Sequence, residues 1–306
     1  MRARRQAGVA VVTALLLTTL AVTIVTSLFW QQQVQIRSME NQRLQLQTKW
    51  ALRAALDWSR QVLRDDAMSS QVDHLGEGWA QPMSKIELDE YVENGREGGA
   101  ASNATLSGRI VDAQARFNLT NLAENGQIDP EALDQFRRLL AIVRLDPALA
   151  MATAQRIAQT QIAPGAPGSG DAAHEQAALS HTADLLTIPG FTPDGVQRLS
   201  EFIALIPQKT FVNVNTAPAE VLAALFNKSP MEMNSVVHAR AQAYFLEENN
   251  FTSRMQITSP TARVTTQSTY FLVYGTVHMD RASVDMEALI YRKNTGNTTL
   301  RWLRSF

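Results

Sequence analysis

Side chains that commonly act as nucleophiles, general bases or metal ligands form no known catalytic pattern in this sequence. It contains no cysteine, which excludes thiolate metal sites, disulfides and cysteine nucleophiles. Neither an H-E-x-x-H motif nor a G-x-S-x-G motif is present. The five histidines are His74, His174, His181, His238 and His278. His181 and Asp184 are three residues apart, a spacing more typical of a surface contact than of a general base, so we expect a protein that is not an enzyme.

The amino end contains the longest apolar segment of the chain. Residues 9–30 carry no charge, and about 20 apolar residues suffice to span a bilayer as a helix. Arginines at positions 2, 4 and 5 precede this segment, and basic residues hold the adjacent end of a membrane span in the cytoplasm. We therefore expect one membrane span, with the chain after residue 30 outside the cytoplasm.

A cleaved secretory signal is the alternative interpretation of this segment. Such signals have an apolar region of about 7–15 residues that ends in a small-residue cleavage site. Here the apolar run is longer, and Thr26, Ser27 and Leu28 form a poor site. The small residue lies before the run instead, at Gly8.

A basic leader that ends in glycine just before an apolar helix resembles the leader of type IV pilins. The resemblance implies that a prepilin peptidase cuts between Gly8 and Val9, that the apolar helix is retained, and that Val9 is N-methylated. Most pilins have a glutamate at the fifth position after the cut, which neutralises the amino terminus of a neighbouring subunit within the lipid. This sequence has Thr13 there. The K-type minor pseudopilins of the type II secretion system, which sit at the filament tip, are similar in lacking that glutamate.

The apolar pattern continues beyond the membrane segment at helical spacing. No glycine or proline interrupts residues 9–64, which predicts a single helix roughly 80 Å long. Its second half, residues 31–65, would pack on a soluble domain, while a plain coiled-coil stalk is the alternative. The apolar positions of that half are Ile36, Met39, Leu44, Ala51, Ala55, Trp58 and Val62.

Two parts of the chain alternate with the period of two that is typical of strands. The early part predicts a strand over residues 83–91, a turn over 93–104, and a strand or bulged pair over 105–118. The late part predicts three consecutive strands, at residues 270–279, 284–292 and 300–306. Three consecutive strands favour an antiparallel sheet, which the early strands can join.

Between these parts the period changes to that of helices. Asp129 and Asp146, each followed by proline, predict two helix starts, and two short helices flank the turn at Pro189 and Gly190. Thr216 can cap a further helix, with Pro218 near its first turn. These pieces resemble helix-hairpin-helix units.

The 306 residues, with a net charge of −1, therefore predict an α+β fold: a pilin-like long N-terminal helix packed on an antiparallel sheet, with an inserted all-α subdomain. The expected divisions are a leader at 1–8, the membrane and periplasmic halves of the helix at 9–30 and 31–65, the first part of the sheet domain at 66–120, the inserted helical domain at 121–255, and the C-terminal strands at 256–306.

Two segments resemble signatures of the K-type pseudopilins. Residues 108–122 resemble the run G-x-I-x-D-x-x-x-[RK]-F-N-[LI]-N-x-L, and residues 213–222 match N-V-N-T-A-P-x-E-V-L. The motif residues are Asp112, Phe117, Asn118, Asn121, Asn213, Asn215, Thr216 and Pro218. We expect Asp112, Asn118 and Asn121 to be turn and cap residues rather than catalytic ones, because these residue types favour local bonds to the backbone.

The resemblance implies a function in protein export. A K-type minor pseudopilin caps a short periplasmic filament, the pseudopilus, and takes part in export across the outer membrane. Its implied partners are the minor pseudopilins of the I and J types, the major pseudopilin and the prepilin peptidase. Its implied location is the inner membrane, with a cytoplasmic amino terminus and the bulk of the chain in the periplasm.

Two other functions stay open at this point. One is a membrane-anchored helix-hairpin-helix protein for DNA binding or uptake, and the other is a minor pilin of another type IV filament. Residues 183–254 hold five basic and seven acidic residues, which disfavours binding to phosphates, so we expect no nucleic-acid partner.

Calcium is the one metal that the resemblance brings into question. Some K-type pseudopilins hold calcium in the inserted domain through an acidic run. The matching loop here, residues 163–175, has only Asp171 and Glu175, whereas calcium takes about 6–8 oxygen ligands. We therefore expect no cofactor.

Overall fold

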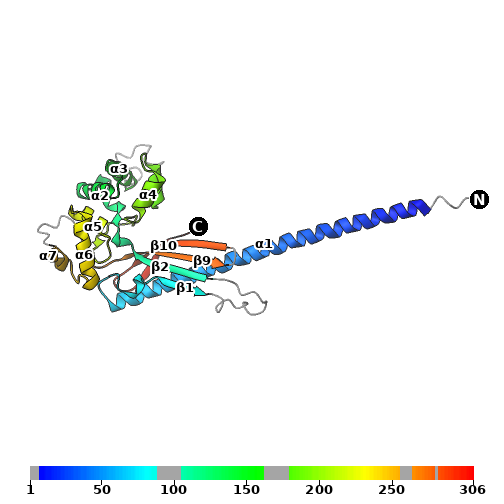
Figure 1. Cartoon of the computed structure of the whole chain (residues 1–306), viewed down its shortest axis with the longest axis horizontal. Helices are drawn as coiled ribbons and strands as arrows, with labels where there is room; N and C mark the ends of the chain where they lie inside the picture. Colours follow the sequence, from blue (N-terminus) through cyan, green and yellow to red (C-terminus); the bar gives the residue numbers. More distant parts are fainter. Residues whose placement is uncertain (1–6, 88–104, 162–178, 256–263, 280–281) are drawn as a thin grey trace, which may run out of the picture.

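The longest element is helix α1, Ala7–Ser69, in a computed structural model that describes residues 7–87, 105–161, 179–255, 264–279 and 282–306. Its 63 residues correspond to about 95 Å of helix at 1.5 Å per residue. Figure 1 shows its first half projecting alone from the rest of the molecule. The prediction of one unbroken helix is confirmed, although α1 ends later than residue 64, because Asp66 stays in the last turns and binds Arg292.

The first part of α1 is apolar on all sides and has no protein neighbour that buries it. By length and composition it is the one candidate membrane span in the described part of the chain, and none of its most apolar stretch is buried. A lipid-covered helix has this surface, whereas a soluble helix buries one apolar stripe.

A single antiparallel sheet lies along the C-terminal half of α1 (Figure 1). Its strand order is β1-β2-β9-β10-β11, so the early and late parts of the chain share one sheet, as predicted. The strands are β1 Met83–Glu87, β2 Thr105–Asp112, β9 Tyr270–Met279, β10 Ala282–Arg292 and β11 Thr298–Ser305.

The alternation of side chains along β9 explains how the sheet has two covered faces. Phe271 and Val273 belong to the core against α1, whereas Leu272 and Tyr274 contribute to a cluster on the opposite face. The core against α1 includes Leu52, Ala55, Leu56, Leu63, Trp79, Leu106, Ile110, Phe271, Val273, Val277, Met286, Ala288 and Ile290. The mean burial of both faces at this end of the sheet leaves room for a second layer of structure.

The chain leaves the sheet after Asp112 and returns at Tyr270, into two strands that are direct neighbours. Figure 1 shows the intervening helices gathered at the end of the sheet farthest from the projecting half of α1. They are α2 Pro130–Ile142, α3 Leu149–Gln161, α4 Pro193–Ser200, α5 Ala219–Phe226, α6 Pro230–Gln242 and α7 Glu248–Arg254, with the 3-10 helix η5 Thr182–Thr187.

These helices share one apolar core and start at the residues that cap them. Asp129 accepts hydrogen bonds from the backbone N–H groups of Glu131 and Ala132, as expected of the cap of α2. The core includes Phe117, Phe136, Leu139, Leu140, Leu185, Leu199, Val214, Val221, Leu222, Val236, Phe245 and Phe251.

Several predicted boundaries differ from the structure. Residues 105–118 are not one strand, because the chain turns through η2 Ala113–Ala115 and then forms β3 Phe117–Asn118, which pairs with β6 Ile203–Ala204 in another small sheet. The inserted part therefore begins nearer 113 than 121, and it extends to 269 rather than 255. Helix α7 was not predicted. The predicted features at Tyr91, 93–104 and 163–175 lie outside the described residues.

Candidate functional site

Buried polar side chains collect where α1, the sheet and the inserted helices meet. We call them the junction cluster: Asp66, Asp73, Asp112, Asn213, Thr216, Ser268 and Arg292. Asp66 lies at the end of α1, Asp112 at the end of β2, and Arg292 at the end of β10. Asn213 ends the short strand β7, Val212–Asn213, and Ser268 precedes β9. The cluster thus joins elements that are far apart in the sequence.

Asp112 is the acceptor at the centre of this cluster. One carboxylate oxygen accepts from the backbone N–H of Gln114 at 2.7 Å. The other accepts from the hydroxyls of Thr216 and Ser268, both at 2.6 Å, and from the Asn213 amide at 3.1 Å. A buried carboxylate needs several donors to offset its lost hydration, and Asp112 has four.

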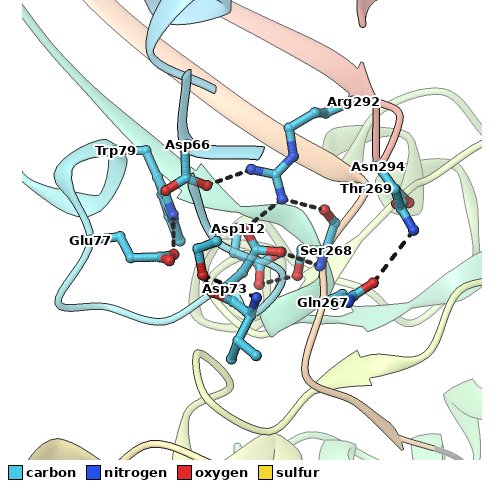
Figure 2. Close-up of polar contacts among 12 residues, drawn as sticks. Asp66, Asp73, Glu77, Trp79, Asp112, Gln267, Ser268, Thr269, Arg292 and Asn294 are labelled. Carbon is cyan, nitrogen blue, oxygen red and sulfur yellow. Dashed lines mark hydrogen bonds and ion pairs between the residues drawn. The ribbon is translucent and has the colours of Figure 1, made fainter. Parts of the chain in front are cut away.

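Arg292 links the carboxylates of Asp66 and Asp73. Its guanidinium donates to Asp66 at 2.6 Å, to Asp73, and to the Ser268 carbonyl at 2.9 Å. The same guanidinium lies 4.5 Å from the centre of the Phe271 ring. Figure 2 shows Arg292 directed at Asp66 and Asp73, with Ser268 beside it. One cation from β10 therefore holds both α1 and the segment that follows it.

The cluster holds more carboxylates than cations, and this raises their pKa values. Burial is the largest cause for each: it raises the pKa of Asp66 to about 6 and that of Asp112 to about 6, and it also raises the pKa of Asp73. The charge of Glu77 raises the pKa of Asp66 further, whereas Arg292 lowers it.

The carboxylates of Asp66, Asp73 and Glu77 lie within 4.8 Å of one another, a spacing at which a cation could bind. Their oxygens already accept hydrogen bonds, from Arg292 for both aspartates and from the Trp79 indole at 2.8 Å for Glu77. Calcium would need about 6–8 oxygen ligands, so Arg292 supplies the positive charge here with fewer groups. The arrangement is a buried salt bridge between structural elements.

The asparagines of the first signature bind a distant segment. Asn118 donates to the carbonyl of Gln208 at 2.8 Å and accepts from the Ile206 N–H at 3.1 Å. Asn121 forms two bonds with the backbone of Thr210, at 2.8 and 3.1 Å. Asn118 also accepts from the Thr120 N–H, the local bond of a cap, but the long-range bonds involve more of each amide.

The second signature works in the same way. The Asn215 amide pairs with both backbone groups of Phe245, each at 2.9 Å. Thr216 does not cap a helix as predicted, because its hydroxyl donates to Asp112; Pro218 occupies the cap position of α5, with no side-chain bond. Phe117 is buried and stacks on Phe136, with ring centres 5.5 Å apart.

Sequence reasoning did not identify Asp66, Asp73, Ser268 or Arg292 as site residues. Asp66 was interpreted as part of the helix end, and Arg292 as the end of a strand. Arg292 and Asp66 are separated by 226 positions, so no local spacing marks their pairing. The only available signal was the position of each polar residue next to an apolar strand or helix end.

His181 has a structural role rather than that of a base. Its Nδ1 accepts from the Ala183 N–H at 3.0 Å, and its Nε2 lies 3.3 Å from Glu287. Asp184 completes the cap by accepting from the His181 N–H at 2.8 Å. Both ring nitrogens therefore bind other parts of the chain.

The hairpin glycine of the helix-hairpin-helix-like segment serves packing. Gly190 has a φ of +103°, and a Cβ there would lie 2.7 Å from Leu149 of α3. The glycine is needed for contact with a helix, so its lack of a side chain has an explanation that involves no phosphate.

The leader residues lie at the start of α1. Gly8 and Val9 are in its first turn. The Thr13 hydroxyl lies 3.0 Å from the carbonyl of Val9 and 3.0 Å from that of Ala10, so its hydrogen-bonding capacity is used within its own helix.

Comparison with known proteins identifies the family. Two sequence profiles described as type II secretion system protein K match residues 115–208 and 212–273. The type II secretion system protein K of Pseudomonas aeruginosa is 32% identical over 311 residues, which cover 94% of this chain and 89% of that protein. The protein K of Aeromonas hydrophila is 25% identical over 247 residues, 72% of this chain and 70% of that protein.

A solved structure shares the fold. The crystal structure of the GspK-GspI-GspJ complex from the enterotoxigenic Escherichia coli type 2 secretion system superposes with a TM-score of 0.62 and 17% identity, over 88% of this chain and 99% of that one. Both signatures lie mostly within the profile matches, and the relatives are similar along most of their length. The chain belongs to the type II secretion system protein K family, whose members are minor pseudopilins.

Proposed function

We propose that this minor pseudopilin is an inner-membrane protein that caps the tip of the type II secretion pseudopilus and acts as a structural subunit without catalysis. Residues 9–30 would anchor it, the prepilin peptidase would cut between Gly8 and Val9, and the remainder would lie in the periplasm. The apolar, unburied surface of the first part of α1 supports the anchor. The arginine-rich leader supports a cytoplasmic amino end.

The observation that carries the tip position is the side chain at Thr13. A subunit that joins beneath another would neutralise the amino terminus above it with a carboxylate, because an unpaired charge within lipid is costly. Thr13 has no charge, and its hydroxyl is bonded to its own helix. The chain can still offer the amine of Val9 to a subunit below. This asymmetry favours the top position.

The I- and J-type minor pseudopilins are the proposed partners. The solved structure with this fold is that of a complex named for K, I and J components. The bulk of the inserted helices supports the same position, because they lie at the end of the molecule farthest from the membrane helix (Figure 1), where a subunit above would need room.

A structural role agrees with the way the polar residues are used. The carboxylates and amides of both signatures bind other parts of the chain, which joins the inserted helices to the sheet and to α1. Such a network keeps the two layers in one orientation, which a subunit that others assemble beneath requires.

Thr13→Glu tests the tip assignment. If the pair within the lipid matters, the variant gains the ability to join beneath other subunits, and the length or number of pseudopili changes in electron micrographs. Thr18→Glu, one and a half turns further along the same helix, is the matched control for a carboxylate that lies away from that position. If Thr13→Glu caps assemblies and supports secretion as the parent does, the electrostatic account of the tip position fails.

A further inference from the structure

A cavity of about 370 Å³ opens between the outer face of the sheet and the inserted helices. Its volume falls within the range of about 300–1,000 Å³ of ligand sites. Leu272, Leu289 and Trp302 line it from three neighbouring strands, and Arg109 and Arg116 line it from β2 and from the turn after it. None of these residues belongs to the junction cluster, so the cavity is a separate feature of the molecule.

Two guanidinium groups of this cavity converge on one tyrosine. The Arg109 guanidinium carbon lies 5.0 Å from the centre of the Tyr274 ring, and Arg116 Nη1 lies 3.4 Å from the Tyr274 hydroxyl. Within the described part of the chain, neither arginine is ion-paired with a carboxylate. Guanidinium is suited to two parallel hydrogen bonds with a carboxylate, so both groups retain capacity for an acidic ligand.

The carboxylate closest to these arginines along the sheet is already used. Glu287 faces Tyr274 across the strand pair, and it accepts from His181 Nε2 at 3.3 Å. Because His181 Nδ1 accepts from the Ala183 N–H, the ring proton is on Nε2 and is donated to Glu287. The next residue in this row is Arg304, whose Nη2 donates to the Ser180 carbonyl at 3.0 Å, while its buried Nη1 has no hydrogen-bond partner among the described residues.

The register of the sheet places the charged and apolar groups in two adjacent rows. One row contains Arg109, Tyr274, Glu287 and Arg304 as cross-strand neighbours, and the other contains Leu272, Leu289 and Trp302. Tyr274 and Leu272 are two positions apart on β9, so the rows are about 7 Å apart at 3.4 Å per residue. An extended polypeptide also repeats one face every two residues, at the same distance.

We propose that this cavity binds an extended segment of a partner polypeptide, with an acidic side chain at Arg109 and Arg116 and an apolar side chain two residues away on Leu272, Leu289 and Trp302. The inference rests on the proposed function in one respect: a subunit of a protein-export filament meets polypeptides as its ligands. The chemistry requires a carboxylate and an apolar group at a spacing of two residues.

The test uses the full chain in detergent micelles and a fluorescein-labelled peptide of the repeat Asp-Ser-Leu-Ser, with binding followed by anisotropy. Two control peptides replace Asp by Asn, or move Leu next to Asp. We expect the Asp-Ser-Leu-Ser peptide to bind at least tenfold more tightly than either control, because a hydrogen bond to a charged group is worth about tenfold or more in affinity.

Substitutions identify the site and give effects of opposite sign. Arg109→Gln combined with Arg116→Gln should weaken binding at least tenfold, and the exposed Arg109→Gln alone should weaken it several-fold. Glu287→Gln should strengthen binding, because it removes a negative charge and keeps an acceptor for His181. Arg137→Gln, on the exposed face of α2, is the matched control and should leave binding unchanged.

Equal binding of the Asp and Asn peptides, binding that survives both arginine substitutions, or no binding by the parent chain overturns the proposal. Unchanged thermal unfolding of Arg109→Gln shows that a loss of binding is not a loss of folding. The peptide assay involves no other pseudopilin, so its failure while the chain still co-purifies with the I and J types refutes the binding site alone. Loss of that co-purification concerns the proposed function instead.

Discussion

Arg292→Gln perturbs the junction at the point where most depends on one side chain. The Arg292 guanidinium is the sole cation that the structure shows bonded to Asp66 and Asp73 within the described residues, and its side chain is 6% exposed. Glutamine keeps polar atoms in place but removes the charge. Two carboxylates that are also shielded from water then remain without a counter-ion.

The expected loss is large at neutral pH. Breaking a buried ion pair by removing one partner costs about 3–5 kcal/mol in the free energy of unfolding. The loss has the upper part of this range available to it, because Arg292 serves two carboxylates and the Ser268 carbonyl together. A pair on the surface, such as Arg137 with Asp134, is worth about 0.2–1 kcal/mol.

The loss also depends on pH, and its sign follows from the pKa values. In the parent chain the pKa values of Asp66 and Asp112 rise from 3.8 to about 6 on folding, so between these pH values the folded chain holds more protons than the unfolded chain. The free energy of unfolding therefore falls as pH rises through this window. Because Arg292 lowers the pKa of Asp66 and of Asp73, its removal raises both pKa values further and makes that fall steeper.

Chemical unfolding of the full chain in detergent micelles, followed by near-ultraviolet circular dichroism between pH 5 and 8, measures both effects. We expect Arg292→Gln to lose about 3–5 kcal/mol near pH 8 and clearly less near pH 5, where the carboxyl groups are protonated. Arg137→Gln should change stability by under about 1 kcal/mol at either pH. A loss for Arg292→Gln as small as that of Arg137→Gln, or one that does not change with pH, would refute the electrostatic account of the junction.

Three other substitutions and one metal test follow from the same structure. Gly190→Ala should destabilise the inserted helices by about 1–3 kcal/mol, since its φ is +103° and a Cβ would meet Leu149 at 2.7 Å, whereas Gly78→Ala, with nothing within 4 Å, should be neutral in the same unfolding assay. Gly8→Val should leave a full-length precursor in membranes, and a mature amino terminus beyond residue 30 in intact mass spectra would contradict retention of the span. Ser38→Cys, in a chain without other cysteines, should react with a membrane-impermeant maleimide in spheroplasts, and Ala3→Cys should not. Removal of divalent metals with EDTA should leave the thermal unfolding midpoint unchanged, and a large drop would point to a structural metal.

The parts of the fold that were predicted from the sequence are those with a long periodic signal. Residues 9–64 lack any helix breaker, and the strands around Tyr270 and Arg292 alternate over ten or more positions. Helix α7 has no such signal, because its seven residues include a single buried one, Phe251, which packs on Phe226 and Phe245. Its helical state is fixed by that tertiary contact rather than by its own pattern.

The candidate site was predictable in its residue types but not in its partners. Asp112 turns the chain out of the sheet by accepting from the Gln114 N–H, and the apolar pattern of residues 105–118 continues smoothly across that turn. Thr216 has the local context of a helix cap, yet the buried charge of Asp112 is the stronger acceptor. A local rule predicted the wrong partner there, because the right one lies 104 positions away.

Co-purification is the most direct test of the central claim, that this chain assembles as a minor pseudopilin at the pseudopilus tip. The full chain with an affinity tag at its carboxyl end would be expressed with the I- and J-type pseudopilins of the same secretion cluster and extracted in mild detergent. The account predicts a complex that contains one copy of each of the three proteins by native mass spectrometry. Recovery of the tagged chain alone, while the I and J types remain soluble and intact, would contradict it.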